Sequence, residues 1–231
     1  YFFGMHSGSH DYFPKAEKNK LFRNKSPIKK IEHPYLTDWF THEAIDQMTV
    51  AEKPFFCFLS LNTPHTPMQA KEEDLARFFH IKGKRRQTYA AMQWCMDLNI
   101  GKILAHLKTT KQIENTLIVF YSDNGGSVTA SHACNAPLNG MKGSFLEGGI
   151  RVPFIFHWPK GLPSRKVFKH PFTSLDLLPT FVAAAEKILP PRITKKGRKR
   201  IINYDGYNLL PFLRGDITKA PHEALFWRMT M

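Results

Sequence analysis

Apolar residues recur every three or four positions in the longest periodic stretch of the chain, between residues 85 and 107. They are Tyr89, Met92, Met96, Ile100, Ile103 and Leu107. This spacing places them on one face of an amphipathic helix of about six turns. A second helix is predicted from Thr37, which can cap it, to about Val50. A third is predicted from Ser174 to Glu186, with Pro179 ending or kinking its first turn.

Continuous apolar runs of strand length predict three buried strands, at Phe55–Leu61, Thr116–Tyr121 and Val152–Trp158. Such runs are typical of strands that are buried on both faces of a parallel sheet. Because strand and helix stretches alternate, we expect an α/β fold with a mainly parallel sheet flanked by helices. Residues 1–35 show little periodicity and predict a long loop.

Composition divides the chain into three segments. Residues 1–186 predict one α/β domain, residues 187–203 a basic, Pro-containing linker or insertion, and residues 204–231 the start of a small C-terminal α+β subdomain. The chain opens with Tyr1 inside an aromatic, Gly-containing stretch, so we interpret it as a fragment. No apolar run approaches the roughly 20 residues that span a bilayer.

The formal net charge is +14, which favours polyanionic partners. Basic residues gather at Lys15–Lys30, Lys82–Arg86 and Lys195–Arg200, either as solvated loops or as contacts for an acidic polysaccharide. We find no nucleic-acid-binding module beside this charge and do not predict a nucleic-acid partner. The three cysteines form no CxxC pair and indicate neither a disulfide framework nor a zinc site.

Oxygen-bearing side chains and glycines follow the second predicted strand, as Ser122-Asp123-Asn124-Gly125-Gly126. In open α/β sheets, ligands bind beyond the carboxyl ends of the strands. A carboxylate and an amide oxygen suit calcium or magnesium. The alternative interpretation is a tight turn in which Asp123 and Asn124 act only as local caps.

A second glycine-rich stretch runs from Gly140 to Pro153 and contains Lys142. Amid these glycines, Lys142 could present its charge to an oxyanion. Glu147 and Arg151 could pair and stiffen the turn. A surface loop with a solvated lysine is the alternative, but this stretch leads directly into the third predicted strand.

A histidine between two prolines follows the first predicted strand, in Thr63-Pro64-His65-Thr66-Pro67. The prolines hold His65 in a stiff loop, from which its imidazole could donate a proton to a leaving oxygen. A lone histidine is more often structural, so this motif gains weight only beside the other two.

Together these strings resemble the sulfatase family, whose arylsulfatase-like members belong to the alkaline-phosphatase-like superfamily. The matching strings keep the family's order and approximate spacing; they are Pro64–Pro67, Tyr89–Gly101, Ser122–Gly126, Lys142–Pro153 and Asp176–Thr180. The resemblance implies an alkaline-phosphatase-like α/β fold and a partial catalytic domain in residues 1–186. It also implies hydrolysis of sulfate esters in a secreted, periplasmic or lysosomal protein.

The resemblance further implies residue roles. Asp123 and Asn124 match two ligands of the family's calcium ion, and Lys142 matches the lysine that contacts the sulfate group. His65 matches the histidine at the scissile ester oxygen. Ser9, in Ser9-His10-Asp11, resembles a loop residue that could contact the sulfate. The expected substrate is a sulfated small molecule or polysaccharide.

The family's nucleophile is a cysteine converted to formylglycine in a Cys-x-Pro/Ala-x-Arg setting. The nearest string here is Cys134–Leu138, which has leucine where arginine is required. We therefore expect the nucleophile and the first metal-ligand aspartates upstream, and no activity from residues 1–231 alone. The alternatives are a phosphomonoester or phosphonate hydrolase of the same superfamily, or a catalytically inactive polyanion-binding module.

Overall fold

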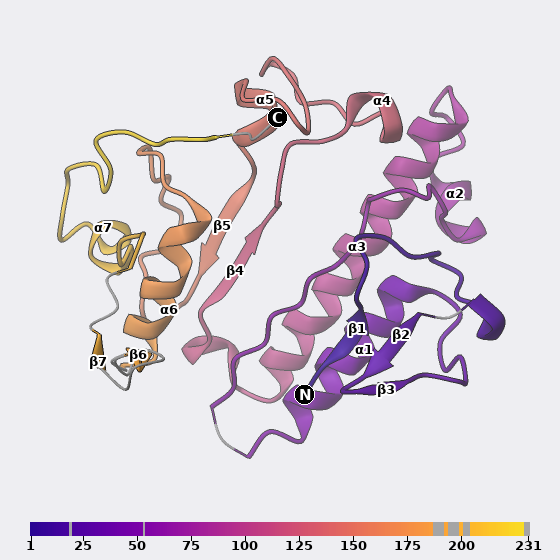
Figure 1. Ribbon diagram of the computed structural model, residues 1–231, viewed down its shortest axis with the longest axis horizontal. Helices are drawn as coiled ribbons and strands as arrows, with labels where there is room; N and C mark the ends of the chain where they lie inside the picture. The colour runs from indigo at the N-terminus through magenta and orange to yellow at the C-terminus, as the bar shows by residue number, and fades with distance from the viewer. Residues whose placement is uncertain (19, 53, 187–191, 194–198, 201–203, 229–231) are drawn as a thin grey trace. The chain divides into compact units, whose positions relative to one another are not determined.

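The computed structural model in Figure 1 describes every residue except 19, 53, 187–191, 194–198, 201–203 and 229–231. The predicted linker at 187–203 therefore lies mostly outside the described residues. The chain forms two compact units, residues 1–111 with 122–153, and residues 112–121 with 154–231. No helix in the described part of the chain is both long and apolar enough to cross a membrane.

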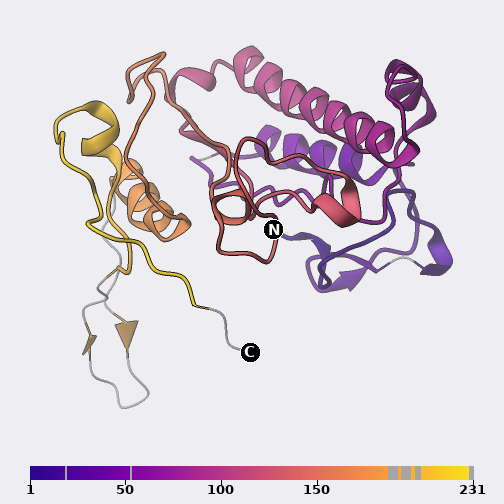
Figure 2. The same cartoon turned by 90° about the horizontal axis from the view of Figure 1, so that it is seen from above.

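Three helices build most of the first unit: α1 (Leu36–Thr49), α2 (Glu72–Arg77) and α3 (Lys84–Thr109). The two helices predicted in this region are confirmed, and Figure 2 shows α3 lying along α1. Thr37 does not cap α1, however, because the helix begins one residue earlier and Tyr35 is its N-cap. The Thr37 hydroxyl instead lies 2.6 Å from the Thr63 hydroxyl in the loop that carries His65.

Residues 1–35 contain a small antiparallel sheet of β1 (Phe3–Met5), β2 (Leu21–Arg23) and β3 (Ser26–Pro27), with a 3-10 turn at Ala16–Lys18. The prediction of a loop throughout this region is wrong. The strands are only two or three residues long, which is too short to show an alternating pattern in the sequence. One face of the sheet packs on α1 through a buried cluster of Leu21, Leu36, Trp39 and Phe40.

A polar network joins α1 to α3 at Asp38. Its carboxylate accepts hydrogen bonds from Asn99 Nδ2 at 2.7 Å and Lys71 Nζ at 3.1 Å, with Lys102 Nζ at 3.4 Å. Burial alone would raise the pKa of Asp38, but the hydrogen bonds and the lysine charges outweigh burial and hold it below its usual value. The network therefore stabilises the helix pair while Asp38 is ionised.

The second unit contains β4 (Ile118–Tyr121), β5 (Phe154–His157) and α6 (Leu177–Ala184). Strands form at both predicted places, but the predicted burial is wrong, because no residue of β4 or β5 is buried and Ile155 is 57% exposed. The predicted helix is confirmed, and Pro179 lies in the first turn of α6, where no intrahelical bond is lost. The other elements are 3-10 turns at Ile113–Asn115 and Ser174–Asp176, β6 (Arg192–Ile193), β7 (Lys199–Arg200) and α7 (Leu210–Arg214).

The described strands pair only in antiparallel fashion, so the predicted parallel sheet among them is wrong. β4 and β5 pair from Ile118↔His157 to Tyr121↔Phe154. The connection between them holds only α4 (Val128–Ser131) and α5 (Glu147–Ile150), of four residues each. This connection, residues 122–153, exceeds the dozen or so residues that a parallel crossover needs, so its length does not explain the antiparallel pairing.

The segment Phe55–Leu61 forms no strand, contrary to its apolar pattern. Phe56 is 73% exposed and Phe58 is 69% exposed. A strand is defined by its ladder of hydrogen bonds to a neighbour, and no other described strand pairs with this segment. High β-propensity alone therefore does not produce a strand here.

We expect Lys71→Met to lower the free energy of unfolding by about 1–3 kcal/mol at pH 7, because it removes a charged hydrogen bond to Asp38. The matched change Lys102→Met should cost less than about 0.5 kcal/mol, since the Lys102 side chain is half exposed and water screens its charge. Urea unfolding of both variants would measure the difference.

The pH dependence follows from the depressed pKa of Asp38. Its contribution is present above the unfolded-state pKa of about 3.9 and is lost as the pH falls through the lower folded-state pKa. The Lys71→Met penalty should therefore shrink in acid. A penalty equal to that of Lys102→Met at every pH would contradict this account.

Candidate functional site

His65 and Lys142 meet in the first unit although 77 positions separate them in the sequence. Lys142 Nζ lies 3.3 Å from His65 Nε2, and both residues are exposed. His65 Nδ1 lies 2.8 Å from the Thr66 carbonyl oxygen, which can only accept a hydrogen bond. The proton therefore belongs on Nδ1 in this arrangement, and Nε2 faces the ammonium group as an acceptor.

Two buried tyrosines hold the loop that carries His65. The Tyr12 hydroxyl lies 2.7 Å from the Asn62 carbonyl oxygen and 3.0 Å from that of His65. Tyr12 N donates to Gln69 Oε1 at 2.7 Å, and the Tyr35 hydroxyl donates to the Gln69 carbonyl at 2.8 Å. These bonds satisfy main-chain groups of a loop that has no regular secondary structure.

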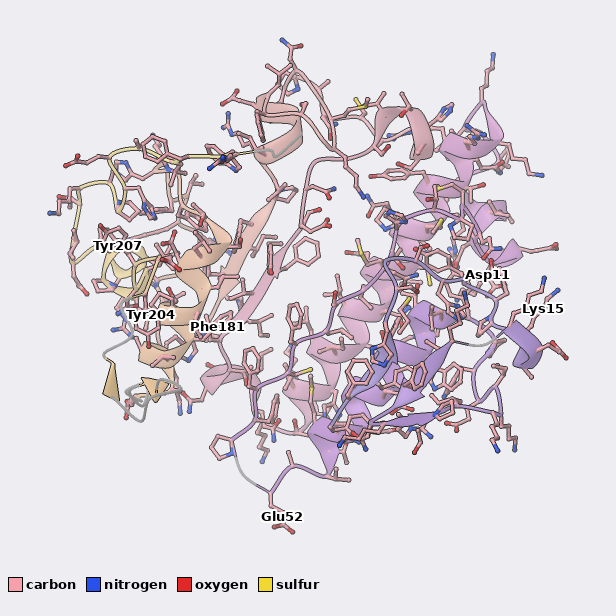
Figure 3. All side chains as sticks on the ribbon, viewed as in Figure 1. Asp11, Lys15, Glu52, Phe181, Tyr204 and Tyr207 are labelled. Atoms are coloured by element: carbon pink, nitrogen blue, oxygen red, sulfur yellow. The ribbon has the colours of Figure 1, made fainter. Side chains whose placement is uncertain are left out.

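Ser9 lies on the segment that leads to Tyr12. It is exposed, and its carbonyl accepts a 2.9 Å hydrogen bond from Ser7 Oγ. In the described part of the chain, no hydrogen bond joins Ser9 to His65 or Lys142. Asp11, labelled in Figure 3, connects the same segment to the His65 loop by accepting from Gln69 Nε2 at 3.2 Å.

Asp123 and Asn124 follow directly after β4, as the motif predicts. Asp123 is exposed, and Asn124 Nδ2 donates to the Gly125 carbonyl at 3.0 Å, which leaves Asn124 Oδ1 as a free acceptor. Their oxygens suit calcium, but calcium takes six to eight oxygen ligands. Among the described residues no group of three or more His, Cys, Asp or Glu side chains could hold a metal. The pair therefore fits part of a calcium site.

Asn135 ties the Asp123 loop to the Lys142 loop, a role that the sequence reasoning missed. Asn135 Oδ1 accepts from Gly126 N at 2.9 Å, and Asn135 Nδ2 donates to the carbonyl oxygens of Gly126 at 2.9 Å and Gly140 at 3.1 Å. Lys142 N adds a bond of 3.4 Å to the Gly126 carbonyl. Asn135 lies inside the string compared above with a nucleophile motif, and no spacing rule reveals side-chain contacts of this kind.

Two glycines allow the main chains of these loops to touch. Gly125 N donates to the Gly149 carbonyl at 2.9 Å, and Gly148 N donates to the Asn139 carbonyl at 2.7 Å. A Cβ atom on Gly125 would overlap the Gly148 carbonyl, and one on Gly148 would overlap the main chain at Asn139. Glycine is thus required at both positions by close backbone approach.

The predicted pairing of Glu147 with Arg151 is confirmed, with Arg151 Nη1 3.5 Å from Glu147 Oε1. Both side chains are about two-thirds exposed, so water screens the pair and it contributes little to stability. The shape of the Lys142 loop therefore depends mainly on Asn135 and the glycines.

Comparison with known proteins identifies relatives of this chain. The sequence profile of the sulfatase family matches residues 2–188. The chain is 29% identical to "Uncharacterized sulfatase YdeN" of Escherichia coli (strain K12), over 98% of this chain and 39% of that protein. It is 34% identical to Arylsulfatase H of Canis lupus familiaris, over 75% of this chain and 29% of that protein. The chain thus spans well under half the length of these relatives.

Solved structures show the same relationship. The crystal structure of Ps i-CgsB in complex with k-i-k-neocarrahexaose has a TM-score of 0.76 and 42% identity, over 87% of this chain and 42% of that one. A phosphonate monoester hydrolase from Silicibacter pomeroyi shares the fold, with a TM-score of 0.55 and 23% identity over 94% of this chain and 47% of that one. These neighbours confirm the predicted alkaline-phosphatase-like α/β fold. Because the family profile matches most of its residues, the chain belongs to the sulfatase family.

Proposed function

We propose that the whole protein hydrolyses sulfate esters of a sulfated carbohydrate, with Lys142 and His65 at the reacting group. The observation that supports this proposal is the 3.3 Å approach of Lys142 Nζ to His65 Nε2, inside the region that matches the family. A fixed cation beside an imidazole suits a substrate that is an anion and must release an oxygen. The carbohydrate is supported by the relative crystallised with neocarrahexaose, which is 42% identical.

The reaction breaks the bond between sulfur and the bridging oxygen, and the electron pair of that bond remains on the leaving oxygen. Lys142 would hold the non-bridging sulfate oxygens by charge-assisted hydrogen bonds. When Lys142 turns to the sulfate oxygens, His65 Nε2 would take up a proton from solvent and then donate it to the leaving oxygen. The bond from Nδ1 to the Thr66 carbonyl keeps the ring oriented throughout.

Other groups complete the proposal. Asp123 and Asn124 would supply oxygen ligands to calcium, which polarises sulfate oxygens when bound, while a formylglycine outside residues 1–231 would supply the nucleophile. Ser9 would act as a further contact for the sulfate group. The proposal places the protein where the family resemblance does, in a secreted, periplasmic or lysosomal setting.

The test of this proposal is Lys142→Ala in the whole protein. We expect kcat/KM for an aryl sulfate to fall by about 10²–10³, because the cation that binds the sulfate oxygens is removed. Lys108→Ala, which changes an exposed lysine of α3, is the matched control and should keep full activity. Unchanged turnover in Lys142→Ala, or faster hydrolysis of an aryl phosphate than of the aryl sulfate by the unmodified protein, would sink the proposal.

Asn135→Ala should lower kcat by about tenfold to a hundredfold without removing any group that contacts the sulfate. It deletes the three hydrogen bonds that fix the Asp123 loop against the Lys142 loop. Asn139→Ala is the control, since Asn139 is exposed and contributes its carbonyl oxygen, which the substitution keeps. Steady-state kinetics of both variants would measure this difference. Equal kcat values would show that the hydrogen bonds of Asn135 do not position the site.

Calcium affinity should depend more on Asp123 than on Asn124, because a carboxylate brings a full charge and an amide only a dipole. In the whole protein, calorimetric titration should show weaker binding for Asp123→Ala than for Asn124→Ala. Residues 1–231 alone should bind calcium weakly or not at all. Equal and tight binding by the short chain and the whole protein would contradict the assignment of these residues as partial ligands.

A further inference from the structure

The outer face of the β1–β2–β3 sheet carries a row of rings. Side chains alternate between the faces of a strand, and Phe3, Met5 and Leu21 point inward to the cluster on α1. Phe2, His6 and Phe22 therefore lie on the opposite face. The rings of Phe2 and His6 stack with centroids 5.5 Å apart, and those of His6 and Phe22 lie 4.7 Å apart. We call these three residues the aromatic face.

The aromatic face is partly exposed: Phe2 and His6 are exposed, whereas Phe22 is half-buried and its ring is tilted 50° to that of His6. The Phe2 ring lies over Gly4, where an added Cβ would be only 3.3 Å from Phe2 Cζ. Phe22 pairs with Gly4 on one side and with Pro27 on the other, so no bulky side chain rises between the rings. Phe2 is 40% exposed. A row of rings on a glycine and a proline is a surface on which a flat apolar group can rest.

Two lysines flank this face. The hydrogen bond from Ile28 N to Leu21 O, at 2.9 Å, continues the β2–β3 pairing, and both side chains belong to the inner face. Their neighbours Lys20 and Lys29 therefore point outward, beside the rings, and both are exposed. In the described part of the chain no ion pair engages either ammonium group, so both charges are available to an anion.

The aromatic face is connected to the candidate site by direct contacts. Lys20 N lies 3.3 Å from His10 Nε2, and the hydroxyl of Tyr12, two residues further on, lies 3.0 Å from the His65 carbonyl. One short segment therefore borders both surfaces.

We propose that the aromatic face, with Lys20 and Lys29, binds the chain of a sulfated polysaccharide outside the reacting sugar. The C–H faces of sugar rings would rest on the electron-rich faces of the aromatic rings. Sulfate groups on the same chain would contact the two lysines, drawn by the net charge of +14. This inference rests on the proposed function for its choice of ligand. A single-stranded nucleic acid offers similar chemistry and is an outcome of the test.

The experiment measures the affinity of the whole protein for a carrageenan oligosaccharide by biolayer interferometry, at fixed ionic strength. No turnover is needed, so failure of the proposed hydrolysis would not affect the result. We expect Phe22→Ala to weaken binding about tenfold, the scale of one lost stacking contact. The double variant Lys20→Glu with Lys29→Glu should weaken it by at least about tenfold, and the loss should diminish at high salt.

The matched control is Lys82→Glu with Lys84→Glu, which makes the same charge change in another exposed basic cluster of the first unit and should weaken binding less than about twofold. The same oligosaccharide after chemical desulfation should bind far more weakly. Phe22→Leu keeps apolar bulk without a ring, so a folded Phe22→Leu variant that has lost affinity supports stacking.

Three results would overturn the inference. They are equal losses in the two charge-reversed variants, full affinity in Phe22→Leu, and tighter binding of single-stranded DNA than of the oligosaccharide with the same dependence on Phe22. Equal losses would show that the attraction is non-specific. Full affinity in Phe22→Leu would show that binding needs no aromatic ring at this position. Tighter binding of DNA would assign the face to nucleic acid.

Discussion

Main-chain hydrogen bonding in loops is the constraint on which the candidate site depends. The residues that carry its chemistry lie on stretches with almost no helix or strand, so secondary structure cannot satisfy their amide and carbonyl groups. Side chains do so instead, with Tyr12 and Tyr35 holding the His65 loop and Asn135 joining Gly126 to Gly140. Helices α1 and α3, fixed to each other through Asp38, form the rigid support beneath them.

Sequence periodicity predicted those helices and strands whose own residues show a regular apolar pattern. The long helix α3 was recoverable from its three- or four-residue apolar spacing, and the strand β4 from a short continuous apolar run. The direction in which strands pair was not recoverable. β4 and β5 pair antiparallel although residues 122–153 between them are long enough for a parallel crossover. Phe55–Leu61 shows the same limit, since its composition cannot supply a neighbouring strand.

The sequence could select candidate residues for the site, but it could not predict the contacts that hold their loops in place. Family resemblance selected His65 and Lys142, and the structure places their side chains 3.3 Å apart. It also selected Ser9, which the described contacts leave outside this pair. Asn135 gave no signal, because its three hydrogen bonds join segments whose proximity exists only in the folded chain. The glycines were visible as a cluster, while the need for each comes from the neighbouring carbonyl that a Cβ atom would strike.

Three of the supporting side chains, Tyr12, Tyr35 and Asn135, are neutral, and this has a consequence for a site that handles anions. Burial raises the pKa of both Tyr12 and Tyr35, so their hydroxyl groups remain protonated donors well above neutral pH. The amide of Asn135 does not titrate at all. The support of the His65 and Lys142 loops therefore keeps its hydrogen bonds between pH 5 and 8, where imidazoles ordinarily change charge. Because these supports add no fixed charge beside the site, the attraction of Lys142 for a sulfate group is neither offset by them nor made dependent on their protonation.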